Sequence, residues 1–570
     1  MAPLGMLALD PAGWFAFGPV KWLVVTVALL TGAARRLRAH PVRMPRRLGW
    51  LAAAFLGWLS VCAVVGADPV YAWVGTPERH LGVLTWGLLV LALVVGTTMT
   101  VTRDGPTLAA GLGVAGLGVG ATAAAEALGW EPLVFQAGDR LSGTFGSAAF
   151  LGAAAALLLP ACVGAAADRA LPARTRVLSA AALPLLLVAL VGSGARAAWL
   201  GTAVATLVVA WSQRAWLRAH GRLAGWAGAA LVAAGGLVLL VTPMGGRLAD
   251  LTDPDAPGGR GRLDEWRVAT RAIADHPVTG VGPEGYRIEF GAAVDAAYER
   301  AHGREQQPDR AHSGPLDLAL AGGLPGLALW GALLAVVGRA VCAALRSGHT
   351  VVVGLGAALV AHWVGQLLLF PVAEIEPLAW LLAGLLVAAA PAPDGPRQVV
   401  PRAVPAALGV LAVVALVAGV TDVVADRRAA DAVAALERGD AATAVASAER
   451  ARDLRPDVVR LHVLAAAALV ADERGTVAGI AALGDALAVS PGDPIVLLGR
   501  AGLLVDRAEA TQVPSHVDRA RREVEGLLRS DPHSAALWRL AGRVAQLEGD
   551  RAAAADATAR ADDLTPPPAP

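Results

Sequence analysis

The chain has 570 residues, of which 56% are hydrophobic and 17% charged, and its formal net charge is +1. Soluble domains carry closer to a quarter charged residues, so a chain this long and this apolar needs lipid to cover much of its surface. Its three cysteines offer neither a disulfide framework nor metal-ligand spacing, and nothing in the charge balance points to nucleic acid as a partner.

Apolar runs that could cross a bilayer recur along the first three quarters of the chain. A span needs about 20 residues, and most of the runs reach that length. Many are rich in Ala and Gly, which let membrane helices approach closely. The sequence predicts an all-α polytopic bundle of about twelve spans, near residues 14–34, 48–67, 81–100, 107–128, 146–168, 177–195, 197–213, 223–242, 315–343, 350–372, 375–391 and 402–423.

Arginine is concentrated in alternate short loops. The arginine-rich loops hold Arg35, Arg36, Arg38, Arg43, Arg46, Arg47, Arg169, Arg174, Arg176, Arg214, Arg218, Arg222, Arg346, Arg397 and Arg402. The loops between them hold little beyond Arg79 and Arg140. Basic loops stay in the cytoplasm, so we expect the loops at 68–80, 129–145 and 243–314 on the outer face of the plasma membrane, together with the C-terminal part.

After Val423 charged residues return, and apolar ones take helical spacing. Similar segments end at Pro456, Pro491, Pro532 and Pro566, at intervals of 35, 41 and 34 residues. This period resembles the tetratricopeptide repeat, a pair of helices about 34 residues long. We therefore expect a membrane domain at 1–423, a soluble α-solenoid of helix pairs at 424–566, and a disordered tail at 567–570.

The loop at 243–314 is too long for a simple connector. It holds a helical stretch around Trp266 that ends before Pro277, then Gly280, Gly282 and Gly285, and finally His312 beside the next span. The glycines spell G-x-G-x-x-G, but no strand precedes them, so a tight turn at the membrane surface is favoured over a nucleotide site. A lone interfacial histidine is usually a polar anchor, although a neutral imidazole also serves as a general base.

Four arginines stand where the outer surface is expected: Arg79, Arg140, Arg196 and Arg262. Their ordinary role would be to anchor lipid head groups or to snorkel from a span end. Short outer loops disfavour arginine, however, and a guanidinium binds phosphate oxygens in pairs while staying charged. The four arginines thus form a candidate site for a phosphorylated ligand.

Five segments in order resemble the O-antigen ligase and polymerase family. They read "VGTPERHLGVLTW", "DRLSGTFGSAAFLG", "GSGARAAWLG", "RLDEWRVATRAIADHPVTGVGPEGYRIEF" and "DRAHSGPLDLALAGGLPGLALW". Together they fall within roughly residues 68–390. The sequence departs from the family pattern at Ser313, where an Asn is usual, at Ser147-Ala148-Ala149, and at Ala321, where a Glu is usual.

The resemblance implies a GT-C-like membrane glycosyltransferase without cofactor or metal. Its donor would be a glycan on a polyprenyl diphosphate, and its acceptor a hydroxyl of a glycan, lipid or protein. His312, Arg196 and Arg262 would be catalytic. Arg196, Arg262, Arg79 and Arg140 would bind the donor diphosphate, and Trp266, Gly280, Gly282 and Tyr286 would shape the loop.

Other functions remain open on the sequence. Within the class, the chain could be an O-antigen-type polymerase or a protein O-oligosaccharyltransferase. In another class, it could be a non-catalytic membrane scaffold whose repeats bind proteins. In either case we expect the C-terminal repeats to dock a protein partner and to take no part in chemistry.

Overall fold

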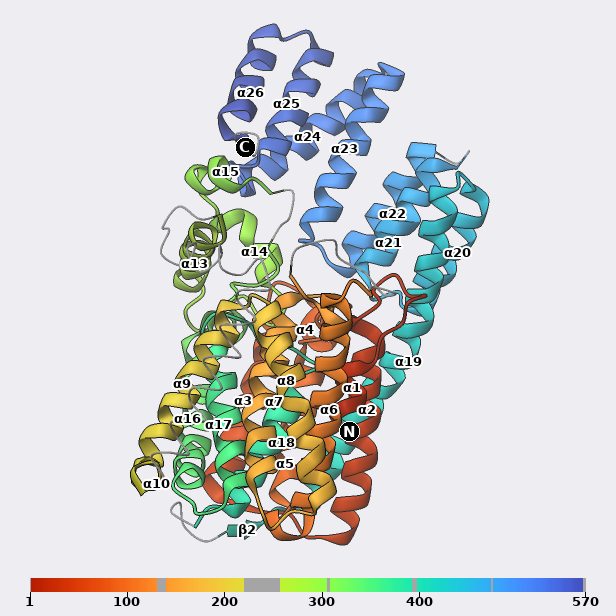
Figure 1. The fold of residues 1–570 in the computed structure, drawn as a ribbon. Helices are drawn as coiled ribbons and strands as arrows, with labels where there is room; N and C mark the ends of the chain where they lie inside the picture. The colour runs from red at the N-terminus through yellow and green to blue at the C-terminus, as the bar shows by residue number, and fades with distance from the viewer. Residues whose placement is uncertain are drawn as a thin grey trace.

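The computed structural model describes residues 2–130, 140–219, 257–304, 308–391, 397–472 and 475–566. The predicted span at 223–242 and the predicted tail at 567–570 lie outside these residues. The described chain is mostly helical, and its strands form one short pair. Figure 1 shows a bundle of long helices joined at one end to a stack of helices from the C-terminal part. The predicted all-α fold is confirmed.

A helix occupies each predicted span range that the structure describes. These helices are α2 (Gly18–Ala39), α3 (Arg46–Val65), α5 (Val83–Thr97), α6 (Val101–Ala127), α7 (Ala148–Ala167), α8 (Ala173–Gly192), α9 (Arg196–Ser212), α16 (Gly314–Leu345), α17 (Thr350–Gly365), α18 (Glu376–Ala389) and α19 (Ala403–Glu437). Two short helices, α1 (Ala2–Leu7) and α10 (Arg214–Ala219), accompany them. Within the described residues, α3, α6, α7, α8, α16 and α19 are long and apolar enough to cross a membrane, whereas α5, α17 and α18 are apolar but shorter.

Small residues bring the bundle helices close together, as their abundance in the sequence predicts. A Cβ built on Gly164 of α7 would lie 2.8 Å from the Cα of Gly354 in α17. A Cβ on Gly96 of α5 would lie 3.0 Å from the Cα of Gly384 in α18. Since lipid removes the hydrophobic driving force between spans, such close backbone packing holds the bundle together.

The bundle end away from the C-terminal helices gathers two of the arginine-rich loops. Strand β1 (Arg43–Pro45) pairs antiparallel with β2 (Arg397–Val399), with Met44 opposite Gln398. Both strands therefore lie on one side of the bundle, as the arginine pattern predicts. In Figure 1, β2 lies at the bottom of the bundle, far from the blue C-terminal helices.

Short elements cover the opposite end of the bundle. They are α4 (Tyr71–Val74), the 3-10 helix η1 (Gly143–Phe145), α13 (Pro257–Asp275), α14 (Tyr286–Ala293) and α15 (Ala296–His302). Helix α16 is kinked near this end, where Gly323 has a φ of 63°. Only glycine adopts that conformation without strain, so the kink is encoded locally.

The C-terminal part is a series of packed helix pairs. It continues from α19 with α20 (Ala441–Leu454), α21 (Val459–Ala471), α22 (Gly475–Val489), α23 (Pro494–Thr511), α24 (Pro514–Ser530), α25 (Ala535–Glu548) and α26 (Arg551–Leu564). Each recurring proline follows the second helix of a pair. Helix α19 runs through the predicted domain boundary without a break. Assignment of the pairs to the tetratricopeptide class stays a prediction.

Candidate active site

The described part of the long loop at 243–314, called the outer loop after its expected side, folds as a small unit with its own apolar core. Its helices α13, α14 and α15 bury Val268, Phe290 and Tyr298 against one another. The rings of Phe290 and Tyr298 meet edge to face, with centroids 5.5 Å apart. The predicted loop-shaping residue Tyr286 is buried in the same core. A loop packed in this way can hold side chains in fixed positions.

The glycine segment forms a tight turn wedged between two bundle helices. Gly280 and Gly282 have φ values of 62° and 84°. Between them, the Val281 amide donates to the Leu320 carbonyl of α16 at 2.7 Å, and the Val281 carbonyl accepts from the Ala67 amide at 2.9 Å. A side chain at Gly280 would meet the Leu320 carbonyl oxygen at 2.1 Å. The G-x-G-x-x-G spelling thus corresponds to a tight turn.

His312 lies between the loop unit and the start of α16, with its backbone in the left-handed region (φ 52°). The carboxylate of Asp317 accepts hydrogen bonds from the amides of the two flanking residues, Ala311 at 2.9 Å and Ser313 at 3.3 Å. The indole of Trp266 donates to the Ala311 carbonyl at 2.9 Å. These contacts hold a conformation that costs energy in isolation, as is common at functional sites.

A carboxylate that the motif analysis did not single out faces His312. The Nδ1 atom of His312 lies 3.3 Å from Oε2 of Glu265. Both atoms are buried, and neither has a hydrogen-bond partner elsewhere in the described chain. Glu265 lies one helical turn after Arg262, so the two share a face of α13, and that spacing could have identified it.

Arg196 and Arg262 lie near enough for their charges to interact. Arg196 is the first residue of α9, directly after the turn that ends α8. Arg262 lies on α13, where burial lowers the pKa of its guanidinium; Glu265 opposes this effect and the nearby Arg196 adds to it. Within the described chain, neither guanidinium has a hydrogen bond or an ion pair. Two unpaired cations at close range repel each other, so an anion between them would be favoured.

The other two predicted arginines lie beside this pair but are already engaged. Arg79 donates from Nε to Asp309 at 2.7 Å, and its guanidinium lies 4.9 Å from the centre of the Phe370 ring. Burial opposes the charge on Asp309, but Arg79 holds the pKa of that carboxyl down at about 2. Arg140 donates from Nε to the Ser193 carbonyl at 2.8 Å, in the turn before Arg196. All four predicted arginines therefore lie around one site at this end of the bundle, which we call the mouth. Arg79 and Arg140 support its walls.

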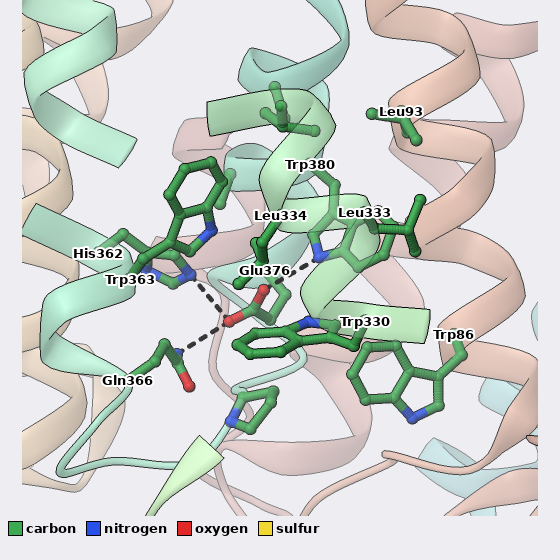
Figure 2. A pocket seen from close by; sticks show the side chains of 14 residues that line it. Trp86, Leu93, Trp330, Leu333, Leu334, His362, Trp363, Gln366, Glu376 and Trp380 are labelled. Atoms are coloured by element: carbon green, nitrogen blue, oxygen red, sulfur yellow. Dashed lines mark hydrogen bonds and ion pairs between the residues drawn. The ribbon is translucent and has the colours of Figure 1, made fainter. Parts of the chain in front are cut away.

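A tryptophan-lined pocket opens in the bundle beneath the mouth, between α5, α16, α17 and α18 (Figure 2). Its apolar walls include Trp86, Trp330, Trp363 and Trp380. One carboxylate points into it. Glu376 accepts from Gln366 Nε2 at 2.9 Å and Trp380 Nε1 at 3.1 Å, and lies 2.9 Å from His362 Nε2.

The pocket adjoins the mouth through one short segment of chain. Pro371 lines the pocket, while the preceding Phe370 packs edge to face on His312, with centroids 5.4 Å apart. A charged group at the mouth and an apolar chain in the pocket could thus belong to one ligand. Among the described residues, no group of three His, Cys, Asp or Glu side chains could hold a metal ion.

A comparison with models of protein families gives a match for one segment of the chain. Residues 181–331 match a family model described as O-antigen ligase. This segment carries Arg196, Arg262, Glu265 and His312, so the resemblance found in the motifs is confirmed over the range that holds the site. The match covers about a quarter of the chain. No curated protein matches the chain.

Proposed function

We propose, on the basis of the O-antigen ligase domain at residues 181–331, that the protein transfers a glycan from a polyprenyl diphosphate to an acceptor hydroxyl on the outer face of the plasma membrane. The observation that carries the proposal is the unpaired Arg196–Arg262 couple beside the His312–Glu265 pair. Guanidinium groups can donate paired hydrogen bonds to the oxygens of a diphosphate. A histidine held by a carboxylate can accept the proton of a hydroxyl.

The two arginines balance the charge of the leaving group. As the bond between the anomeric carbon and the phosphate oxygen breaks, negative charge grows on the departing diphosphate. In this proposal, Arg196 and Arg262 contact its oxygens. The proposal gives this role to arginines rather than to a metal, so transfer should continue in the presence of EDTA.

His312 receives the proton of the acceptor. A carboxylate at Glu265 favours the tautomer with hydrogen on Nδ1, which leaves Nε2 free to accept. The acceptor oxygen forms its bond to the anomeric carbon while its proton passes to Nε2. Direct displacement of this kind inverts the configuration at the sugar carbon. The isoprenoid chain of the donor packs in the tryptophan-lined pocket below.

Purified protein with a lipid-linked glycan tests the proposal. A lysine ammonium cannot bind two phosphate oxygens at once as a planar guanidinium does. Arg196→Lys and Arg262→Lys should therefore each lose most transfer activity, while the protein still inserts into the membrane. Arg267→Lys is the matched control, since that arginine lies exposed on the same helix α13. Near-normal activity of both site variants would contradict the diphosphate assignment. A non-catalytic scaffold would show no transfer even in the unmodified protein.

The acceptor distinguishes the remaining members of the class. A ligase, a polymerase and a protein oligosaccharyltransferase share the donor chemistry and differ in the hydroxyl that attacks. Cells without the protein should accumulate lipid-linked glycan in each case. The product that disappears then identifies the acceptor as lipid, glycan or protein.

A further inference from the structure

The C-terminal helices contact the outer loop through a row of ion pairs. Three loop arginines meet three aspartates, two in turns between those helices and one near the end of α26. The pairs are Arg287–Asp493, Arg304–Asp531 and Arg300–Asp563. In Figure 1 the green α14 and α15 lie beside the blue helices α23 to α26. The edge of the helix pairs that faces the mouth is thus occupied by this chain's own loop, not open to a partner.

Two of these pairs are largely shielded from solvent and belong to larger networks. Arg287 is 12% exposed; it also binds the fully buried Asp68 of the first outer loop, and it lies 5.0 Å from the centre of the Tyr71 ring. Arg304 is 13% exposed and also bonds Glu299 at 2.6 Å. Breaking a buried pair leaves an uncompensated charge and costs far more than breaking an exposed one.

The third pair provides a contrast. Arg300 and Asp563 are 49% and 60% exposed, so solvent screens their attraction and the pair adds little. The two largely shielded networks therefore carry the attachment. We refer to Arg287, Arg304 and their aspartate partners Asp493 and Asp531 as the clamp.

The loop unit connects the clamp to the site. Helices α14 and α15, which carry or adjoin the clamp arginines, share their apolar core with α13. Arg271 of α13 donates to the Ala293 carbonyl of α14 at 3.1 Å, and His302 of α15 lies 3.0 Å from Asp264 of α13. A shift of α14 and α15 would therefore carry Arg262 and Glu265 with it.

The other side of the clamp is tied to the membrane bundle. Helix α19 passes without a break from the bundle into the C-terminal helices. Asp422 on α19 lies 3.1 Å from His80 Nε2 of the first outer loop and also pairs with Arg455. The Val459 amide of α21 donates to the Tyr71 hydroxyl at 2.8 Å. The C-terminal helices are thus fixed relative to Arg196 in the bundle.

We propose that the C-terminal helices are a positioning part of the catalytic unit: through the clamp they hold the outer loop so that Arg262, Glu265 and His312 face Arg196. The activity readout of this proposal rests on the proposed function. A misplacement of about 1 Å in a reacting group can cost 100-fold in rate, so a loosened loop lowers turnover even when every catalytic residue is present. Arg287 and Arg304 act through α13 and are positioning residues.

The test uses the full chain in lipid nanodiscs, with charge reversal on the C-terminal helices, away from the site. Asp531→Arg places a second positive charge beside Arg304, whereas Asp531→Glu keeps the pair. Asp563→Arg is the matched control at the exposed pair. Hydrogen exchange over residues 257–275 reports the order of the loop helix, and steady-state kinetics separate kcat from the donor KM.

We expect Asp531→Arg to raise exchange in α13 and to lower kcat by about 10-fold or more, with the donor KM changed by less than about 3-fold. Asp531→Glu and Asp563→Arg should stay near the unmodified protein. Unchanged exchange in Asp531→Arg would show that the clamp does not hold the loop. Raised exchange with unchanged kcat would show that the clamp does not position the catalytic residues. Either result overturns the proposal. If the unmodified protein transfers no glycan, the proposed function fails, while the exchange measurement still tests the clamp.

Discussion

At the scale of single residues, the site combines free cations with a histidine held in place. Arg196 and Arg262 lack partners in the described chain, while Arg79 is neutralised by Asp309. The four arginines proposed for the donor therefore divide into two that can bind an anion and two that support the walls. Charge that is already paired is a poor ligand for phosphate, because binding would have to break the existing pair.

Glu265 should matter for rate rather than for donor binding. Glu265→Gln keeps the size of the side chain but removes the charge that stabilises a protonated His312, so kcat should fall by about 10- to 100-fold. His312→Ala should lose about 100-fold or more. Kinetics at saturating donor, with donor binding measured separately, check both effects. A Glu265→Gln protein with normal kcat would mean that the carboxylate does not assist His312.

The Arg79–Asp309 pair should show a pH signature. The pKa of Asp309 is held at about 2, below its ordinary value, so the pair contributes stability above about pH 4 that is lost as the pH falls through 2. The difference in melting temperature between the unmodified protein and Arg79→Gln should therefore be full at pH 7 and shrink between pH 4 and 2. Arg397→Gln is the control, because the backbone carbonyls of Val387, Ala388 and Ala390 that Arg397 binds do not titrate.

At the scale of elements, the glycine turn and the kink in α16 fit together. Gly280 and Gly323 both have positive φ, and a side chain on either would strike a backbone carbonyl oxygen, at 2.1 Å and 2.0 Å. Backbone cannot yield as a flexible side chain can, so the loop and the helix must share this geometry. The turn thereby fixes where the chain that leaves α13 meets the bundle.

Substitution of these glycines should uncouple the loop from α16. Gly280→Ala and Gly323→Ala should each destabilise the protein by about 1–3 kcal/mol and lower transfer activity, because both the conformation and the close approach are lost. Gly331→Ala is the control within α16, since nothing lies within 4 Å of a Cβ there. Thermal unfolding in detergent measures the difference, and equal melting temperatures for all three variants would contradict the argument.

At the scale of the whole molecule, the two ends of the bundle carry different segments of the chain. One end gathers arginine-rich loops and the β1–β2 pair, and the other carries the mouth, the outer loop and the C-terminal helices. A polar domain fixed to one end, with basic loops at the other, fits a single orientation in the membrane. The clamp further makes the C-terminal helices part of the same body as the site.

This arrangement predicts the topology directly. A reporter fused near residue 40 or 172 should read cytoplasmic, because those loops are rich in arginine. A reporter fused at residue 570 should read extracytoplasmic. A cytoplasmic signal from the C-terminal fusion would remove the outer-face placement of the site while leaving the helical fold untouched.

The sequence by itself determined the features that depend on local pattern. Apolar runs located the bundle helices, glycine located the turn at Gly280 and Gly282, and recurring prolines located the helix pairs, because each follows from hydrophobic periodicity or from backbone conformation. Motif resemblance also located Arg196, Arg262 and His312, which the fold brings to one mouth.

Only the tertiary structure decided which charges remain free. Asp309 stands three residues before His312, yet its partner is Arg79, 230 residues away. Glu265 looked like one more helical carboxylate until the fold placed it against His312. Likewise, the repeat pattern predicted a docking surface, but its edge near the mouth meets Arg287 and Arg304 of the same chain. Partners separated by hundreds of residues leave no local periodicity, so sequence pattern cannot assign them, and the pairing of each charge follows from the packing of the whole chain.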